Sequence, residues 1–356
     1  MPQIQTFKLW SVLLLLFSII FHRLRLCPQK TQNTFLARPG IEPGTSGAVV
    51  LKCDPLTAVP PRQLNNTYHI APHHPPPRQC EFSHHAQNKR ECGVQKRQTV
   101  PDFVKTRVNE ADPGEFPWAV SLMINLKFSY TGTGSLIHDR VVLTAAHLLE
   151  NKDLENLYAI VGEHDVFKKI LPKKAMKVTE VVVHNKFVSS NGNYNFALAF
   201  LRSSATTNLP HVGTVCLPPA DFVASAGASC AFSGWGTDSA QKQIVQLTKT
   251  EVPMMTHSAC EQKLKQLFGP RFKLYASFTC AGGEVGRDIC TGGGGSPLVC
   301  PIEGQDRYVQ TWIVSWGTDG CGVDGTPLVF ADVAAARPWI DQQMAEHLYS
   351  TASYTY

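Results

Sequence analysis

Short apolar or alternating runs of residues recur along the chain from Phe116 onward, separated by Gly, Asn and Pro. Runs of about four to eight residues bounded by turn residues are typical of β-strands. Their recurrence between such turn signals predicts an all-β barrel or sandwich architecture. The runs are Ala119–Ile124, Val141–Thr144, Tyr158–Val161, Val178–Val183, Ala197–Leu201, Tyr308–Val314 and Pro327–Val333.

The last segment of the chain has a different period. Trp339, Ile340, Gln343, Met344 and Leu348 recur at helical spacing. This pattern predicts that the chain ends in an amphipathic helix that packs on the β domain. The β region and this helix span about 240 residues, which is ample for a well-buried core.

An apolar stretch lies at the other end of the chain. Residues 9–21 are almost entirely apolar and follow Lys8, which is typical of the core of a secretory signal. A small-residue cleavage site is missing, and a buried helix is the alternative interpretation. No apolar run reaches the roughly 20 residues of a membrane-spanning helix. We predict a signal peptide at residues 1–21 and a secreted protein, which the eleven cysteines also favour.

Residues 22–107 show no sustained periodicity and contain several proline-rich stretches. Residues 1–107 carry 14 Lys and Arg against 5 Asp and Glu, whereas residues 108–356 carry 19 against 23. The first part is therefore basic and the second slightly acidic, which gives no reason to expect nucleic-acid binding. We predict a loose, basic Pro/His-rich arm at 22–107 and a globular domain at 108–356.

Five of the six histidines of the arm lie within residues 69–85, and their spacing matches no metal-ligand pattern, so we predict no metal site there. Asn65 opens an Asn-Asn-Thr glycosylation sequon on chain that is expected to be exposed. Lys89-Arg90 and Lys96-Arg97 are candidate processing sites and are equally interpretable as surface charge. The five histidines are His69, His73, His74, His84 and His85.

Six motifs occur in a fixed order in the second part of the chain. Together they resemble the trypsin/chymotrypsin family of serine proteases over nearly all of residues 108–346. The resemblance implies two packed six-stranded β-barrels with a cleft between them. The motifs are GEFPWAV (114–120), GSLIHDRVVLTAAH (134–147), GTVCLPP (213–219), SGWG (233–236), CTGGGGSPLVC (290–300) and SWGTDGCG (315–322).

The resemblance also implies a set of disulfides, one of which joins the arm to the domain. The bridge that usually flanks the catalytic histidine is absent, because its two positions are Gly132 and Leu148. Three cysteines of the arm, Cys27, Cys53 and Cys80, stay unassigned. The implied pairs are Cys92–Cys216, Cys230–Cys300, Cys260–Cys280 and Cys290–Cys321.

Serine protease chemistry needs a hydroxyl nucleophile, an imidazole base and a carboxylate that holds the correct tautomer. The family pattern assigns the base to His147, the carboxylate position to Asn195 and the nucleophile position to Gly294. Asparagine at the carboxylate position costs about 10⁴ in rate, and loss of the nucleophile costs on the order of 10⁶. The chain is therefore expected to lack catalysis, and Ser296 is expected to have a structural role.

The oxyanion loop contains Gly292 and Gly293 in the family alignment. Gly293 replaces the aspartate that pairs with the freed N-terminus of active relatives, so that ion pair is not expected. The specificity pocket contains Asp288 at its floor and Gly317 on one wall. The other wall is Leu328 instead of glycine, and we predict that its side chain fills much of the pocket.

Two sequence features indicate a particular group within the family. They are the GGSPLVCP string that ends at residue 301 and the Cys-Gly that precedes GEFPW. They are similar to the non-catalytic arthropod relatives of clip-domain proteases, including the phenoloxidase-activating cofactors. This implies a secreted, inactive homologue without a cofactor molecule or membrane span. Its implied partners are prophenoloxidase and an upstream clip-domain protease, in melanisation and innate immunity.

One departure and two alternatives accompany this hypothesis. A clip module needs six cysteines, but residues 22–91 hold three, so the module is absent, truncated or replaced. An active trypsin-like endopeptidase is the first alternative, and Gly293, Gly294 and Asn195 argue against it. The second is an inactive relative used for microbial adhesion or as an inhibitor decoy, which the sequence does not separate from the cofactor hypothesis.

Overall fold

The computed structural model describes most of the chain from residue 91 to the C-terminus. The predicted signal peptide, Asn65, the arm histidines and most of the arm lie outside the described residues, as do Asp288, Gly292 and the Cys290–Cys321 pair. The described residues are 91–101, 103, 105, 109–125, 129–206, 208–223, 225–236, 245–283, 293–317 and 326–356.

The first sheet is a closed barrel of six antiparallel strands in the order β1-β2-β3-β6-β5-β4. It closes because β1 pairs with both β2 and β4, so neither edge is left unpaired. Alternate side chains from every strand fill its interior. The strands are β1 (Ala119–Ile124), β2 (Ser129–His138), β3 (Val141–Thr144), β4 (Leu157–Val161), β5 (Lys174–Val183) and β6 (Ala197–Leu201).

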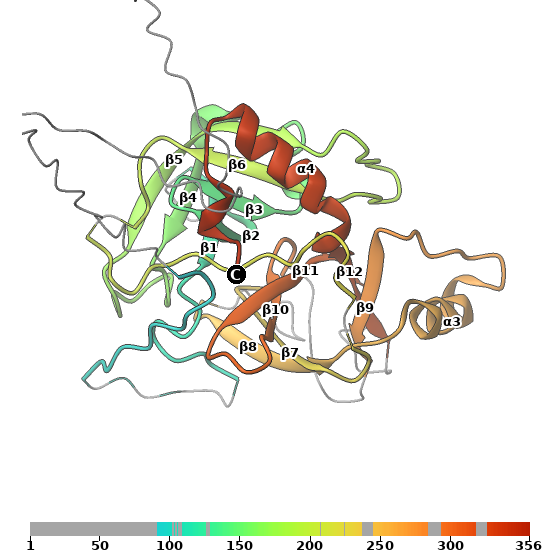
Figure 1. Cartoon of the computed structure of the whole chain (residues 1–356). Coiled ribbons are helices and arrows are strands. Elements are labelled where there is room, and N and C mark those ends of the chain that lie inside the picture. The colour runs from blue at the N-terminus through green and yellow to red at the C-terminus, as the bar shows by residue number, and fades with distance from the viewer. Residues whose placement is uncertain are drawn as a thin grey trace, which may run out of the picture. The chain divides into compact units, whose positions relative to one another are not determined.

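The second sheet has six strands in the order β8-β7-β10-β11-β12-β9. Its two edges meet, because Met254 pairs with Ala281 and the Met255 amide donates to the Cys280 carbonyl at 3.1 Å. The prediction of two six-stranded barrels is confirmed (Figure 1). The strands are β7 (Ser229–Gly234), β8 (Thr248–Pro253), β9 (Phe278–Gly282), β10 (Pro297–Pro301), β11 (Tyr308–Trp316) and β12 (Pro327–Asp332).

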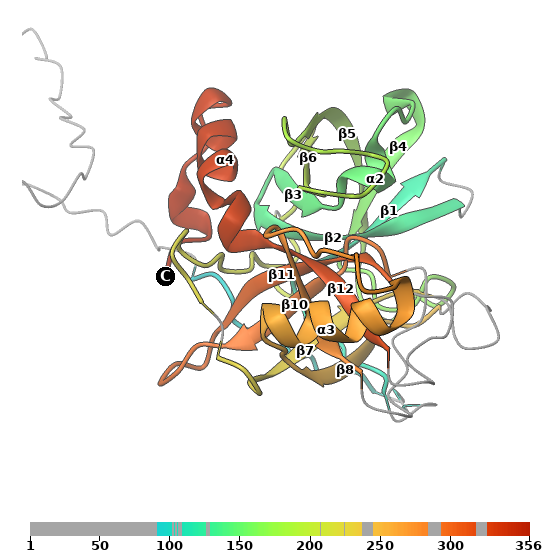
Figure 2. The same ribbon diagram turned by 90° about the vertical axis from the view of Figure 1, so that its right-hand side faces the viewer.

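Few helices accompany the sheets in the part of the chain that the structure describes, and Figure 2 shows the longest of these, α4, beside the first barrel. In α3, Thr256 caps the first turn by accepting from the Ala259 amide, and Leu264 is buried. The sequence pattern did not identify α3. The helical segments are α2 (Ala146–Leu149), η1 (Leu154–Asn156), α3 (His257–Phe268), α4 (Val333–Glu346) and η2 (Thr351–Ser353). No helix in the described ranges is long and apolar enough to cross a membrane.

The predicted C-terminal helix is present as α4, and Trp339, Ile340 and Met344 are buried as its pattern requires. The assignment of Leu348 to its buried face was wrong. The helix ends at Glu346, and Leu348 adopts a left-handed φ of 59° and is 93% exposed. The chain turns at this point, and beyond it the buried Tyr354 donates from its hydroxyl to Asp341 of the helix at 2.7 Å.

All seven predicted strand runs lie in strands, except for the last residue of the last run. Val333 begins α4 instead, because the side chain of Asp332 accepts a hydrogen bond from the Ala334 amide and so caps the helix. Five further strands, β2 and β7 to β10, lay outside the runs that the apolar pattern marked.

The end of the predicted arm is fixed against the domain rather than loose. The Gly93 amide donates to the Thr214 carbonyl, and the Tyr308 amide donates to the Gly93 carbonyl, each at 2.8 Å. Gly93 has a φ of 73°, and a Cβ at this position would lie 2.1 Å from the Tyr308 oxygen. Farther along, the Lys96 amide donates to the Gly114 carbonyl at 2.9 Å. The packed part of the chain therefore begins before residue 108.

Candidate functional site

The pairing of β3 with β6 brings two of the predicted site residues together. Thr144 at the end of β3 is opposite Ala197 at the start of β6. His147 follows β3 on the short helix α2, and Asn195 lies two residues before β6. The register of one strand pair therefore determines that the imidazole and the amide meet.

Three hydrogen bonds fix the orientation of the Asn195 side chain, which is 2% exposed. The His147 amide donates to Asn195 Oδ1 at 3.0 Å. Asn195 Nδ2 lies 2.8 Å from His147 Nδ1 and donates to Ser315 Oγ at 2.8 Å. A backbone N–H can only donate, so the atom facing it must be the amide oxygen, and the NH₂ group must face the imidazole.

This orientation decides the tautomer of His147. Nδ1 accepts from the amide, so the proton of the neutral ring is on Nε2. A ring in this tautomer presents an N–H where a general base needs a free lone pair. Desolvation lowers the pKa of His147, and the hydrogen bond with Asn195 does not reverse that direction. The imidazole is therefore neutral at physiological pH but oriented as a donor.

Gly294 lies opposite the other imidazole nitrogen. A Cβ at this position would be 3.0 Å from His147 Nε2 and 3.3 Å from Leu148 Cδ2. A side chain here would point directly at the imidazole, but glycine supplies no atom there. We call His147, Leu148, Asn195 and Gly294 the catalytic corner, after the triad positions that the sequence assigns to His147, Asn195 and Gly294. It contains an imidazole and an amide, and no hydroxyl or thiol faces Nε2 from position 294.

The side chain of Leu148 covers the glycines of this corner. A Cβ at Gly132 would lie 2.5 Å from Leu148 Cδ1, and a Cβ at Gly295 would lie 2.8 Å from the same atom. The isobutyl group thus takes the space that side chains at these positions would need. The two positions that lack the usual disulfide are in contact, with a leucine packed on a glycine.

Ser296 lies in the same loop but faces the interior. It is fully buried, and a Cβ at Gly234 would be 2.2 Å from its Oγ. Its amide donates to the Gly293 carbonyl at 2.9 Å. A Cβ at Gly293 would be 2.8 Å from Phe232 Cζ, so a phenyl ring occupies the place of a side chain at that position. Because Ser296 is packed on β7, its hydroxyl cannot reach a substrate at the corner.

The residues assigned to the specificity pocket are also in contact. A Cβ at Gly317 would be 2.6 Å from Leu328 Cδ1, so the leucine side chain reaches the opposite wall. Leu328 is partly buried and packs against the core of the second sheet. An apolar group therefore stands in the space between the two described walls.

The trypsin family model matches residues 106–340. The chain belongs to the trypsin family. It is 42% identical to phenoloxidase-activating factor 2 of Galleria mellonella, over 69% of this chain and 86% of the relative. It is 34% identical to the inactive CLIP domain-containing serine protease A8 of Anopheles gambiae, over 70% of each chain. It is 35% identical to the inactive CLIP domain-containing serine protease A3 of Aedes aegypti, over 70% of this chain and 53% of the relative.

Three disulfides support this trypsin-family domain, and all three are among the expected pairs. Cys230–Cys300 joins β7 to β10, and Cys260–Cys280 joins α3 to β9. Cys92–Cys216 joins the end of the arm to the segment before β7. The Arg307 guanidinium donates to the Cys92 carbonyl at 2.9 Å and so secures that junction.

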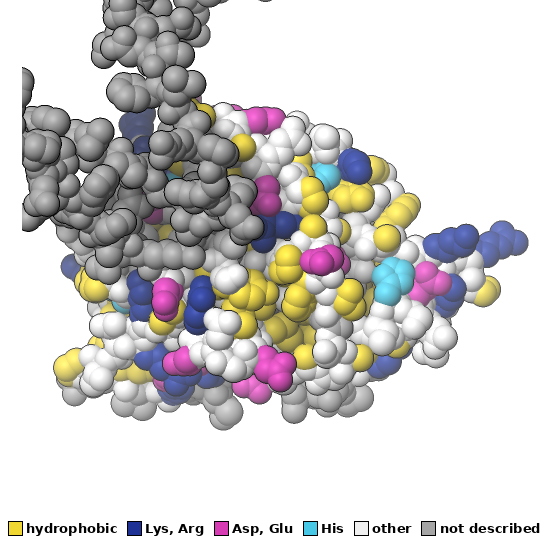
Figure 3. All heavy atoms as spheres, in the orientation of Figure 1, with side chains coloured by type: hydrophobic (Ala, Val, Ile, Leu, Met, Phe, Trp, Pro, Cys, Tyr) yellow, Lys and Arg dark blue, Asp and Glu magenta, His cyan; other side chains and the backbone are white. Residues whose placement is uncertain are grey.

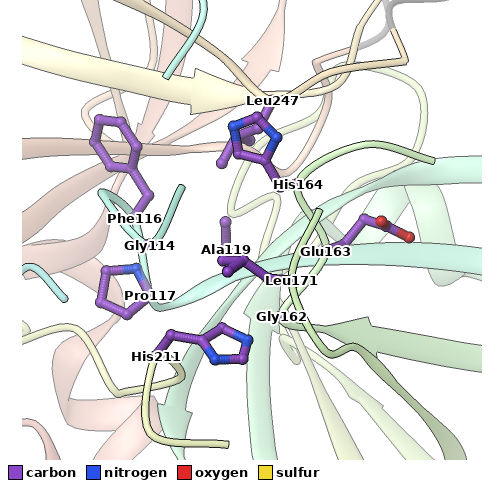
Figure 4. A pocket seen from close by; sticks show the side chains of 10 residues that line it. All are labelled: Gly114, Phe116, Pro117, Ala119, Gly162, Glu163, His164, Leu171, His211 and Leu247. Atoms are coloured by element: carbon purple, nitrogen blue, oxygen red, sulfur yellow. The ribbon is translucent and has the colours of Figure 1, made fainter. Parts of the chain in front are cut away.

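A small pocket of the trypsin-family domain is lined by none of the corner residues (Figure 4). Its lining includes Phe116, His164 and His211, and it has room for about one water molecule. His164 Nδ1 has no partner among the described residues, whereas His211 Nε2 lies 2.8 Å from the Pro172 carbonyl. Burial lowers the pKa of His211. The pocket suits a bound water and is too small for an organic ligand.

The roles of Leu148 and Ser315 were not found from the sequence. Leu148 could have been recognised, because its family partner position had become glycine and left a space to fill. Ser315 gives no signal, since its hydroxyl matters only through the hydrogen bond from Asn195. Among the residues that the structure describes, no group of three or more His, Cys, Asp and Glu side chains could hold a metal ion.

Proposed function

We propose that this protein is a catalytically inactive homologue of the trypsin-family proteases and acts by binding other proteins. His147, Asn195 and Gly294 take the three positions of the catalytic triad in this proposal. The observation that carries it is Gly294, where a Cβ would be 3.0 Å from the imidazole Nε2 and where no nucleophilic atom exists.

Three further contacts support the absence of catalysis. Asn195 donates to Nδ1 and so favours the tautomer that cannot accept a proton at Nε2. Leu148 covers the glycine loop, and Leu328 reaches across to Gly317 in the proposed specificity pocket, whose floor is Asp288. In this proposal Gly292 and Gly293 form an oxyanion loop without the aspartate of active relatives.

The biological role follows from the relatives. We infer a secreted cofactor of prophenoloxidase activation, because the relative from Galleria mellonella is named phenoloxidase-activating factor 2. The partners would be prophenoloxidase and an upstream clip-domain protease. Residues 1–21 would be the signal peptide and residues 22–107 the arm, with a glycan on Asn65. The protease-like domain would be residues 108–356, with Cys290–Cys321 as a fourth disulfide.

Reconstitution of phenoloxidase activity tests the cofactor role. Purified prophenoloxidase and its activating protease are mixed with and without the secreted chain, and oxidation of a diphenol is followed. A large increase with the native chain, absent with the heat-denatured chain, is expected. No increase with a folded, cleaved chain would overturn the cofactor role and would favour adhesion or an inhibitor decoy.

Labelling with a covalent serine probe tests inactivity separately. The native chain is expected to remain unlabelled and to leave an Arg-peptide amide intact, because position 294 carries no hydroxyl. Trypsin under the same conditions is the positive control. Stoichiometric labelling of the domain would show that another nucleophile operates.

A further inference from the structure

Several large apolar side chains are exposed where α3 leads into β9. Leu267 is 48% exposed, Phe268 is 52% exposed and Tyr275 is 44% exposed, while Phe272 is partly buried between them. We call Leu267, Phe268, Phe272 and Tyr275, together with Arg271 and Lys273, the α3–β9 surface. The fold does not need these exposed side chains, because the buried face of α3 consists of Cys260 and Leu264.

Ring contacts hold the apolar part of this surface in place. The rings of Phe268 and Phe272 are 5.3 Å apart, and Phe268 is 6.1 Å from Trp316 at the end of β11. Tyr275 is 6.3 Å from Phe278, which is 6.1 Å from Trp316. Each exposed ring therefore contacts partly or fully buried rings of the domain, which restrict its movement.

The charge of the same segment is strongly positive. Residues 257–278 contain Lys263, Lys265, Arg271 and Lys273 against Glu261 alone. Glu261 is already engaged, because it pairs with Lys265 and accepts from the Leu274 amide at 3.1 Å.

Arg271 and Lys273, between α3 and β9, are available to bind a partner. Arg271 and Lys273 are exposed and make no ion pair with any residue that the structure describes. Figure 3 shows Lys and Arg side chains gathered on the projection that the segment between α3 and β9 forms at the right of the view. In the sequence the two cations stand on either side of Phe272.

We propose that the α3–β9 surface docks an acidic segment of a partner protein in which carboxylates alternate with apolar or aromatic side chains. The proposal rests on the proposed binding function and specifies the chemistry of its partner. Carboxylates would pair with Arg271 and Lys273, and apolar side chains would pack on Phe268 and Tyr275. Arg and aromatic side chains are the residue types that contribute most to protein interfaces.

The positive charge of the arm and the small number of cations on the α3–β9 surface argue against two other occupants of this surface. The arm of the chain itself is basic, with 13 Lys and Arg against 5 Asp and Glu in residues 22–107, so it would be repelled. Recognition of an anionic lipid surface typically uses clusters of about four to eight cations, whereas two uncommitted cations stand here. A short acidic peptide segment fits both the charge and the apolar side chains.

The test measures binding of a fluorescein-labelled peptide in which Glu alternates with Phe and Leu. The full chain is expected to bind this peptide, more weakly as salt rises, and to bind a matched peptide with Gln for Glu at least about tenfold more weakly. Arg271→Glu/Lys273→Glu is expected to weaken binding of the Glu peptide at least about tenfold. Phe268→Ser is expected to weaken binding of both peptides.

The matched control is Lys168→Glu/Lys169→Glu, which makes the same change of net charge on exposed residues of another loop. This control is expected to bind the Glu peptide as the native chain does. Thermal melting checks that each variant is folded, and Arg271→Ala/Lys273→Ala is the milder substitute if charge reversal perturbs the fold. The proposal is overturned if the native chain binds neither peptide, or if the control weakens binding equally.

Two more measurements separate this proposal from the proposed function. If the native chain raises phenoloxidase activity and Arg271→Glu/Lys273→Glu raises it equally, the α3–β9 surface proposal falls and the cofactor role stands. If the chain raises no phenoloxidase activity but binds the peptide as expected, the cofactor role falls and the α3–β9 surface proposal stands. Binding to phosphatidylserine vesicles but not to the peptide, or a dimer that the same double variant dissociates, would also overturn the choice of partner.

Discussion

The catalytic corner and the α3–β9 surface are connected through the neighbouring residues Ser315 and Trp316. Their side chains differ in what they contact. At the corner, Leu148 turns inward and covers glycines, and Asn195 uses all of its described hydrogen bonds within the protein. On the α3–β9 surface, Phe268 and Tyr275 remain exposed.

Under the proposed loss of catalysis, the difference concerns how space is filled. Gly294 leaves room beside the imidazole, and unfilled space between packed side chains costs stability unless a neighbouring side chain fills it. An exposed ring on a rim carries no such penalty and can be kept for recognition. At the corner, Leu148 thus fills the space between glycines, while the α3–β9 surface keeps its rings exposed.

The largest predicted effect is the failure to restore catalysis at the corner. Gly294→Ser, with or without Asn195→Asp, is expected to hydrolyse an Arg-peptide amide at least about 10⁴-fold more slowly than trypsin. The added side chain would meet Leu148 and His147, and Leu328 would still reach Gly317. Amide hydrolysis and labelling by a serine probe are the measurements.

The same experiment has an informative extension. Adding Leu148→Ala and Leu328→Gly to the double variant removes both leucine side chains, and any gain over the double variant measures their obstruction. Rapid, stoichiometric labelling of Gly294→Ser alone would mean that the corner lacks only a hydroxyl, and the contrast with the α3–β9 surface would then lose its basis.

The next effect concerns the disulfides of the second sheet. Cys260→Ala/Cys280→Ala opens a bridge with a sequence separation of 20 residues and is expected to cost about 3 kcal/mol of unfolding free energy. Opening Cys230–Cys300, with a separation of 70, is expected to cost about 4 kcal/mol. Guanidinium unfolding measures both.

Loss of the Cys260–Cys280 disulfide also distinguishes an effect on the α3–β9 surface from an effect on global stability. Because Cys260 lies on α3, its loss should weaken binding of the acidic peptide, whereas loss of Cys230–Cys300 should act on global stability alone. Equal effects of the two variants on peptide binding, measured well below both unfolding midpoints, would contradict an ordered α3–β9 surface.

A smaller effect is expected from pH. The His184 ring stacks on Tyr194 next to the corner and lies tilted against Trp339 of α4, with ring centroids 4.7 Å apart in each case. Desolvation, aided by the charge of Lys186, lowers its pKa from 6.5 to about 4. The unfolded chain therefore binds the proton more readily, and stability that is complete above pH 6.5 is lost as the pH falls toward 4.

The comparison of native protein with His184→Phe isolates this contribution. The native chain should lose about 2 to 3 kcal/mol more than the variant between pH 7 and pH 4. The subtraction is necessary because burial raises the pKa of Asp332 to about 6, which acts in the opposite direction in the same interval. Parallel pH profiles of the two proteins would show that His184 is not held neutral.

The smallest effect is expected at Tyr275. Its hydroxyl accepts from Asn191 Nδ2 at 3.0 Å on an exposed part of the molecule, so Tyr275→Phe should cost less than about 1 kcal/mol. The acidic peptide should bind this variant within about twofold of the native affinity, because the ring is what packs on the partner. A large loss in the peptide titration would assign recognition to the hydroxyl instead.

Much of the first barrel could be predicted from the apolar pattern, and much of the second sheet could not. β1, β3 and β6 are short and wholly or almost wholly buried, so nearly continuous apolar runs mark them. β8 carries Lys249 and Glu251 on its outer face, and β7 contains two serines, which breaks the apolar run.

The candidate site was predictable in its identities and not in its contacts. His147 and Gly294 could be assigned from motifs, but the contact of Leu148 with three glycines depends on side-chain directions that a sequence does not specify. Leu348 was misassigned for a related reason. Helical spacing continues past Glu346 in the sequence, while the backbone stops following it.

The Cys92–Cys216 disulfide means that a cut after Cys92 would not separate the two parts of the chain. The two cysteines are 124 residues apart, and the candidate processing pair Lys96-Arg97 lies between them. A single cut there would yield two polypeptides that stay joined, with one mass on a non-reducing gel and two after reduction. The residues before Cys92 would stay attached to the domain through this disulfide. A cleaved molecule would therefore bring its basic N-terminal segment to any partner of the domain, at an effective concentration in the millimolar range.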